Sequence, residues 1–224
     1  MWMKDYKLVG PITVLYVTLQ LVSDVTAAKL IPIFSFPVSV TAIYFPLTYI
    51  FADVLTEVYG YAVGRRVLWT VLLCSALAAV LYQFAAWLPP APGFSGNAAY
   101  VQILSQVPRI VLGSWVAVFF GEILNDFVLA KMKVWTAGKH LWLRLVGSTV
   151  VGQLTNTALF YTVGLYGVIP DKLLVESIIS GWLIKCAVET ALIPLTYVVI
   201  NKVKEIEKED FFDRSTDFNP FSLK

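Results

Sequence analysis

The hydrophobic residues of the chain fall into six long stretches separated by short polar segments. A membrane-spanning helix needs about 20 predominantly apolar residues, and each stretch is long enough. The last two stretches exceed the minimum, which predicts tilt, a kink or an interfacial extension. Pro194 lies inside the sixth and predicts a kink, because proline removes a backbone donor. We therefore predict an all-α integral membrane protein with six spans, near residues 8–30, 38–59, 67–88, 110–130, 145–168 and 174–200.

Ionisable residues inside these stretches are the most informative exceptions to the pattern. Each costs roughly 2.5–3.5 kcal/mol in hydrocarbon even on a lenient insertion scale, so intramembrane charges indicate functional sites by default. Lys185 is the one base well inside a stretch. The acids inside stretches are Asp24, Asp53, Glu57, Glu122, Asp126 and Glu189.

The spacing of these residues predicts one shared cavity. Residues three or four apart share a helix face, and this spacing joins Asp53 to Glu57, Glu122 to Asp126, Gln153 to Asn156, and Lys185 to Glu189. A rise of about 1.5 Å per residue places most of them near the middle of the membrane. Four helices would thus point polar stripes inward. Two alternatives stay open: Lys185 and Glu189 neutralise each other and only fix the helices, and Asp24 reaches the interface instead.

A weak internal repeat accompanies this spacing. The second stretch contains ADVLTEVYG and the fourth contains GEILNDFVL, and both run acid, apolar, leucine, polar, acid. Three tandem helical hairpins would explain the repeat, as in known transporters. Chance similarity between amphipathic helices explains it equally well.

Lys and Arg residues at the ends of the stretches predict the orientation. Thirteen of them flank one side and three flank the other, and cytoplasmic loops carry the excess. Both termini are therefore predicted to be cytoplasmic. The uncharged segment 89–108 would lie outside as a turn followed by an interfacial helix. Residues 1–204 form the predicted membrane domain, and residues 205–224 form a cytoplasmic tail that we expect to be a solvated helix end and a flexible terminus.

Composition narrows the class further. Hydrophobic residues make up 58% and charged residues 14% of the chain, and the mean hydropathy is +0.73. A soluble domain carries roughly a quarter charged residues, so a cytosolic enzyme is excluded. A net charge of +2 gives no reason to expect a nucleic-acid partner. The two cysteines and single histidine offer no metal spacing and imply no cofactor.

Catalytic motifs are also missing. The sequence has no GxxxxGK[ST], no GxSxG and no HExxH, so we predict that the chain is not an enzyme. A midplane site of carboxylates, amides and one lysine suits a small-solute transporter. Aromatic residues at that depth, among them Phe45 and Tyr49, are able to stack on a planar ring.

One segment carries a resemblance to a known family. The second stretch and its flanks read FPLTYIFADVLTEVYGYAVGRRVLW. This segment resembles the queuosine precursor transporter family, formerly described as vitamin uptake transporters, which shows these residues in this order: Phe45, Pro46, Asp53, Glu57, Tyr59, Gly60, Arg65 and Arg66. The resemblance continues at Arg109, Ser114, Trp142, Arg144, Ser148, Thr149, Gln153, Phe160, Lys185 and Pro194, and covers about residues 21–197.

The resemblance implies a secondary transporter that imports 7-deazaguanine precursors of queuosine, such as preQ0 and preQ1, across the bacterial inner membrane. We expect the substrate to contact Phe45, Tyr49, Asp53, Glu57, Arg109, Glu122, Gln153, Asn156, Lys185 and Glu189. The chain departs from the family at Asp24, Glu122 and Asn156, where we expect Asn, Gln and Asp. These departures leave the preferred precursor open.

Other functions fit the same sequence. A substrate-capture subunit of an ATP-driven, vitamin-type uptake system would also have six helices and no nucleotide motif. A non-transporting scaffold would bind no solute. The expected partners are the lipid bilayer and a small-molecule substrate; a homodimer is compatible with a chain of this size, although no individual residue argues for it.

Overall fold

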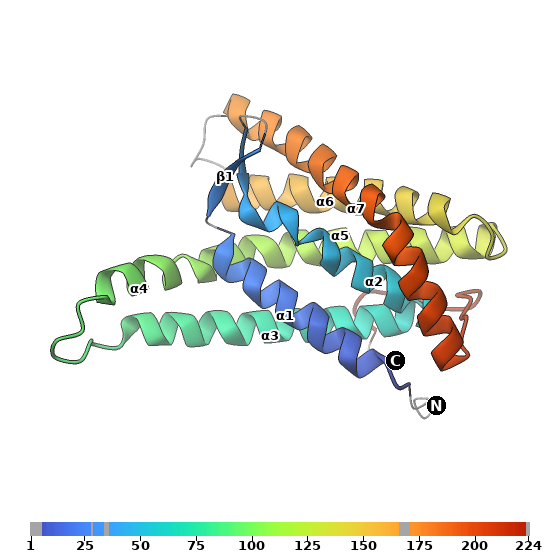
Figure 1. Cartoon of the computed structure of the whole chain (residues 1–224), viewed down its shortest axis with the longest axis horizontal. Helices are drawn as coiled ribbons and strands as arrows, with labels where there is room; N and C mark the ends of the chain where they lie inside the picture. The colour runs from blue at the N-terminus through green and yellow to red at the C-terminus, as the bar shows by residue number, and fades with distance from the viewer. Residues whose placement is uncertain (1–5, 28, 34–35, 166–170, 223–224) are drawn as a thin grey trace.

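The computed structural model describes residues 6–27, 29–33, 36–165 and 171–222. Helices dominate this part of the chain, and one short hairpin with a 3₁₀ turn follows the first helix (Figure 1). In chain order the elements are α1 Val9–Thr26, β1 Leu30–Ile33, β2 Phe36–Ser39, η1 Val40–Ile43, α2 Pro46–Tyr59, α3 Tyr61–Trp87, α4 Asn97–Leu104, α5 Val107–Trp135, α6 Leu141–Leu165 and α7 Asp171–Glu207.

Four regions of the described chain are long and apolar enough to cross a membrane: Val9–Thr26, Tyr61–Trp87, Asn97–Trp135 and Leu174–Glu207. The prediction of a helical membrane protein is therefore confirmed. The helices α2 and α6 do not meet the same criterion. The first has only 14 residues, or about 21 Å, and the second carries buried polar residues such as Gln153 and Asn156.

The hairpin is a feature that the sequence did not predict. Strands β1 and β2 pair antiparallel, and the backbone then turns through η1, where the Ser39 hydroxyl accepts a hydrogen bond from the backbone of Thr41. Helix α2 begins only at Pro46, a residue suited to a first helical turn. Short apolar runs do not distinguish strand from helix, which is why residues 38–45 were predicted as part of the second span.

Helix α2 lies at the centre of the molecule and is almost entirely buried. Its apolar residues, including Val54 and Leu55, pack with Tyr16 of α1, Leu129 of α5 and Ile200 of α7. The outer faces of the surrounding helices instead expose large apolar side chains, including Leu77, Leu112 and Val198. Apolar residues outside and polar residues inside are what a lipid solvent favours.

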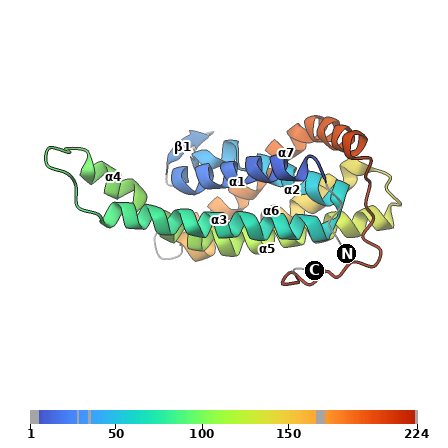
Figure 2. The same cartoon turned by 90° about the horizontal axis from the view of Figure 1, so that it is seen from below.

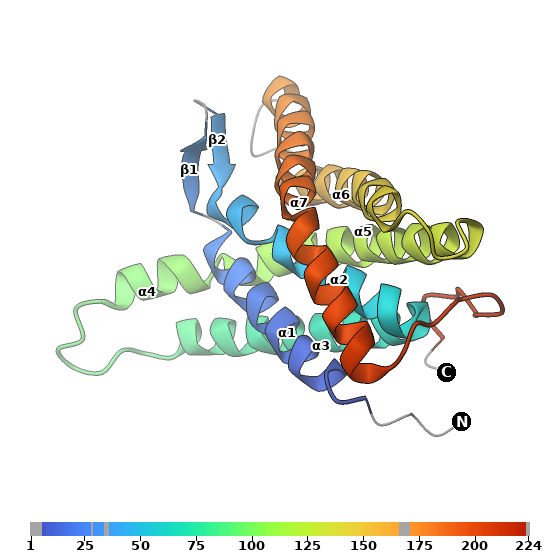
Figure 3. The same cartoon turned by 45° about the vertical axis from the view of Figure 1, so that its right-hand side comes forward.

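The ends of the chain meet at one end of the bundle. Helices α3 and α5 run side by side along the longest dimension (Figure 2), and α7 crosses the bundle toward the end where α1 begins (Figure 3). There the Glu207 carboxylate accepts hydrogen bonds from the backbone of Lys7 and Leu8, at 3.2 and 2.6 Å. Helix α7 is continuous through Pro194, and α4 confirms a short helix in the segment 89–108.

The tail after α7 folds back on the bundle, so the expectation of a flexible terminus is wrong for residues 208–222. The backbone of Phe211 donates to Val58, and the Asp213 carboxylate accepts from the backbone of Tyr61 at the start of α3. Arg65 and Trp69 then donate to backbone carbonyls of the tail between residues 217 and 220. The tail thus connects the end of α2 and the start of α3 to the end of α7.

Candidate transport site

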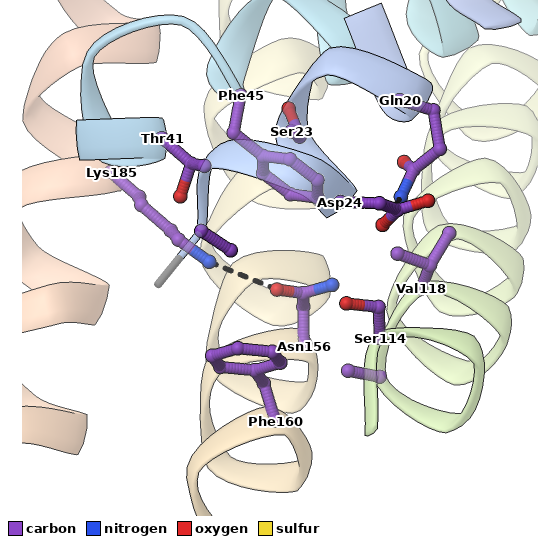
Figure 4. Close-up of a pocket in the computed structure, with 12 residues that line it drawn as sticks. Gln20, Ser23, Asp24, Thr41, Phe45, Ser114, Val118, Asn156, Phe160 and Lys185 are labelled. Atoms are coloured by element: carbon purple, nitrogen blue, oxygen red, sulfur yellow. Dashed lines mark hydrogen bonds between the residues drawn. The ribbon is translucent and has the colours of Figure 1, made fainter. Parts of the chain in front are cut away.

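A pocket lies toward the hairpin end of the bundle (Figure 4). Side chains from α1, α5, α6, α7 and the η1–α2 segment line it. Its polar and aromatic lining consists of Gln20, Ser23, Asp24, Thr41, Phe45, Ser114, Asn156, Phe160 and Lys185. Three of the ten residues predicted to bind substrate, Phe45, Asn156 and Lys185, therefore meet in one pocket.

A hydrogen bond from Lys185 Nζ to Asn156 Oδ1, 2.9 Å long, crosses this pocket. In Figure 4 it runs between the rings of Phe45 and Phe160, and the ammonium group lies 5.0 Å from the centre of the Phe45 ring. No ion pair between Lys185 and Glu189 occurs among the described residues. Lys185 therefore lines the pocket and makes no direct ion pair with its neighbour on α7.

The pocket is contracted in this conformation. Water-sized molecules can occupy about 40 Å³ of it, which is room for a few waters. A bicyclic ring needs more space. Binding of such a ring requires the hydrogen bond between Lys185 and Asn156 to open, or the helices to separate.

Glycines fix the position of Asn156. A Cβ atom on Gly121 of α5 would lie 2.8 Å from the Asn156 Cβ and 2.7 Å from the Tyr49 hydroxyl, and one on Gly152 of α6 would lie 3.1 Å from the carbonyl oxygen of Gly121. Only residues without side chains permit this approach. Small residues thus bring α5 and α6 together and set Asn156 beside Tyr49.

The α1 wall of the pocket was missed by the sequence analysis. Gln20, Ser23 and Asp24 are each no more than 3% exposed. The Asp24 carboxylate accepts hydrogen bonds from Gln20, at 2.9 Å, and from Ser75 of α3. The three- and four-residue spacing was visible in the sequence, but an interfacial position explained Asp24 equally well.

A second group of predicted residues lies beyond the first pocket. Asp53 and Glu189 line a smaller cavity together with Thr149 and Thr196. Asp53 accepts a hydrogen bond of 2.7 Å from Asn125, a residue that the sequence analysis did not single out. Glu189 accepts a hydrogen bond from Gln153.

Tyr49 and Glu122 are fully enclosed near these groups. The Tyr49 hydroxyl and both carboxylate oxygens of Glu122 have no hydrogen-bond partner within the described part of the chain. Glu122 is near enough to Tyr16, Asp53 and Asp126 to interact with them electrostatically. These side chains therefore form a group of buried polar residues in addition to the two cavities.

Glu57 occupies an ion cluster and lines neither cavity. Its side chain is fully buried, and its Oε1 lies 2.6 Å from Arg144, 2.8 Å from Lys204 and 3.5 Å from Lys133. The three cations come from α5, α6 and α7, so this carboxylate links three helices to α2. We name this group, with Asp210, the inner ion cluster.

Asp210 completes the cluster from the tail. It pairs with Lys133 at 2.5 Å and Lys204 at 2.8 Å. Partial burial alone would raise the pKa of Asp210, but the hydrogen bonds from these two lysines hold it below its ordinary value. Its charge therefore persists throughout the neutral range.

Arg109 is the remaining predicted site residue. It is exposed near the start of α5 and lines neither cavity. The structure thus separates the ten predicted residues into the pocket, the smaller cavity with its buried neighbours, the inner ion cluster and this outer arginine.

These features define a class: a multi-pass membrane protein with a polar pocket lined by its helices. The family model described as "Putative vitamin uptake transporter" matches residues 39–199, and the chain belongs to that family. It is accordingly a membrane transporter and not an enzyme.

Two curated relatives agree with this assignment. The chain is 27% identical over 187 residues to "Probable queuosine precursor transporter" of Bacillus subtilis (strain 168), covering 83% of this chain and 82% of the relative. It is 26% identical over 136 residues to "Queuosine precursor transporter" of Escherichia coli (strain K12), covering 59% of this chain and 57% of the relative. No solved structure matches the chain significantly.

Proposed function

We propose that this protein imports queuosine precursors, 7-deazaguanines such as preQ0 and preQ1, across the bacterial inner membrane as a secondary transporter. The observation that carries the proposal is the pocket, which combines two aromatic rings with an amide and a lysine inside a bundle of this transporter family. The names of both curated relatives support the substrate class.

The chemistry of the pocket suits a guanine-like ring. Phe45 and Phe160 offer apolar faces to a planar heterocycle. The Asn156 amide has a donor and an acceptor for the polar edge of a base. Lys185 holds Asn156 in place before binding, and the ring replaces that hydrogen bond with contacts of its own.

We extend the proposal to six membrane spans. The two additional spans are α2, which is short, and α6, which contains buried polar residues. Helix α2 is enclosed by the other helices, and α6 buries its polar residues while Val150 and Leu154 are exposed on its outer face, so neither helix needs to be apolar all round. The start of α1 and the end of α7 lie at the same end as the inner ion cluster, and the positive-inside rule makes that end cytoplasmic. Residues 1–204 are the proposed membrane domain and residues 205–224 the cytoplasmic tail.

The inner ion cluster acts as the cytoplasmic seal in this proposal. It joins α2, α5, α6 and α7 across the end of the bundle that lies away from the pocket. Release of substrate to the cytoplasm requires the helices to part there. Separation of Glu57 from its three cations is thus a step of each transport cycle.

Uptake of radiolabelled precursor into proteoliposomes containing only this chain tests the proposal. We expect saturable uptake that Phe45→Ala reduces by about tenfold or more, since a base–aromatic stack contributes about 1–3 kcal/mol. Phe120→Ala is the matched control, because Phe120 is half exposed on the outer face of α5. It should leave uptake unchanged.

Two results would contradict the proposal. Uptake that occurs only with an added ATP-hydrolysing partner would make the chain a substrate-capture subunit. Failure of the purified chain to bind any 7-deazaguanine would favour a scaffold.

A further inference from the structure

The pocket has two chemically different walls. Lys185 lies on the α7 side, and its ammonium group donates a hydrogen bond to Asn156. Gln20, Ser23 and Asp24 stand on the α1 side, across from Lys185 in Figure 4. One wall is therefore cationic, and the other contains the one acid that lines the pocket among the described residues.

The α1 wall presents acceptors to the pocket. The Gln20 amide nitrogen already donates to Asp24 Oδ1 at 2.9 Å, because a carboxylate only accepts, and the Ser75 hydroxyl donates to Oδ2. The Gln20 Oε1 atom and the Ser23 hydroxyl are buried and have no hydrogen-bond partner within the described residues. What remains available is an amide oxygen, a hydroxyl and the free lone pairs of a carboxylate.

This arrangement fits a ligand group that donates hydrogen bonds and carries positive charge. An ammonium group has three donors and no acceptor, and hydrogen bonds between ionised partners are the strong ones. The opposite wall repels the same group, because Lys185 is itself a cation. The pocket would thus bind an amine-bearing heterocycle in one orientation, with its amine toward α1.

The α1 wall also lies outside the family match. The family model begins at residue 39, whereas Phe45, Asn156 and Lys185 fall within it. The ring-binding part of the pocket therefore belongs to the matched residues, and the α1 wall is contributed by a helix beyond them. This division is consistent with a family that shares one substrate class, in which the α1 residues of each chain determine which substrate of that class it prefers.

We propose that Gln20, Ser23 and Asp24 form a selectivity subsite for a protonated amine on the transported heterocycle, with Asp24 as its counter-charge. The inference rests on the proposed function, because it assumes that the pocket receives the heterocycle. Beyond that function, it states that the protonated amine form of the substrate is preferred and that Asp24 determines this preference.

The test compares two probes on the purified full chain in nanodiscs by calorimetry: the cationic 7-aminomethyl and the uncharged 7-cyano form of 7-deazaguanine. Wild-type protein should bind the amine at least tenfold more tightly. Asp24→Asn should weaken amine binding by about 10- to 100-fold, as expected for a hydrogen bond to a charged group. The same variant should change binding of the uncharged probe by less than about threefold.

Asp126→Asn is the matched control, because Asp126 is a similarly buried acid that accepts a hydrogen bond from the Thr56 hydroxyl and lines neither cavity. It should leave the ratio of the two affinities unchanged. If Asp24→Asn does not fold, Ser23→Ala decides, since it removes one acceptor and should lower the preference for the amine.

The outcomes separate the two claims. Equal binding of both probes to the wild-type chain, or an unchanged preference in the folded variant, overturns the subsite and leaves the transporter proposal standing. Binding of neither probe to the wild-type chain contradicts the proposed function and the subsite together.

Discussion

Lys185 shows how one residue connects the fold to the proposed chemistry. A lysine in the apolar part of a bundle is costly unless its charge is solvated or used. Here it faces a pocket, donates to Asn156 and lies over the Phe45 ring. These two contacts connect α7 to α6 and to the residue that precedes α2, so Lys185 organises the pocket.

Replacing Lys185 tests this role. Lys185→Met keeps the length of the side chain and removes its charge and donors. We expect uptake to fall by about tenfold or more, in line with the loss of a charged hydrogen bond. Lys202→Met, at an exposed position of the same helix, should be neutral, and full uptake by Lys185→Met would remove this residue from the site.

Replacing Glu57 tests whether the inner ion cluster stabilises the protein. The side chains of Glu57, Lys133 and Arg144 are all at most 1% exposed, so Glu57→Gln leaves two buried cations without their common counter-charge. Breaking a buried ion pair from one side costs about 3–5 kcal/mol. We expect the midpoint of thermal unfolding in detergent to fall by roughly 10 °C.

The control for Glu57 is Glu205→Gln, an exposed carboxylate of the same end of the molecule, which should shift the midpoint by less than about 1 °C. Equal midpoints for Glu57→Gln and the wild-type chain would show that the ion cluster contributes no stability.

At the level of elements, the junction between α2 and α3 depends on the tail. Gly60 joins these helices with φ at +90°, a left-handed value that favours glycine. The ring of Phe211 from the tail lies where a Cβ atom of residue 60 would point. Tail and junction are therefore fitted to each other.

Gly60→Ala should strain the backbone by about 1–2 kcal/mol and displace Phe211 from its position. We expect faster cleavage of the tail in limited proteolysis and a lower unfolding midpoint. Gly10→Ala is the control, because Gly10 lies in α1 with nothing within 4 Å of an added Cβ. Identical proteolysis of the two variants would contradict a docked tail.

The elements also show what the sequence was able to predict. Apolar stretches of spanning length located α1, α3, α5, α6 and α7, because the hydrophobic requirement of a bilayer is strong and local. The docked tail was missed because its contacts, such as Asp213 with the backbone of Tyr61, are 152 residues apart and leave no periodic pattern.

The candidate site was predictable in the same limited sense. Helical spacing identified Asn156 and Lys185 as inward-facing, and the structure brings them into contact. Spacing along a helix does not fix distances between helices, however. Glu57 was grouped with Asp53 because they share a face, yet cations from three other helices surround Glu57.

At the scale of the whole molecule, the polar pocket and the inner ion cluster lie at different depths of one bundle. Ion pairs and the tail close the end of the bundle where α7 ends, and the pocket lies nearer the hairpin end. This is the arrangement expected of a carrier that alternates between two sides, with binding groups at the interface of its helices.

The proposed orientation can be measured in intact cells. In a chain with Cys74→Ser and Cys186→Ser, a cysteine at position 95, in the exposed loop after α3, should react with an impermeant maleimide from outside. A cysteine at position 139, in the exposed turn after α5, should react only after the membrane is opened. Equal reactivity at both positions in intact cells would place them on the same side of the membrane and would contradict the single span that the proposal puts between them.

The central claim is that the pocket between α1, α6 and α7 receives the heterocycle. An experimental structure of the chain bound to a 7-deazaguanine precursor tests it most directly. We predict the ring between Phe45 and Phe160, with the hydrogen bond between Lys185 and Asn156 broken. A ring bound at any other place, with that hydrogen bond intact, would contradict the account.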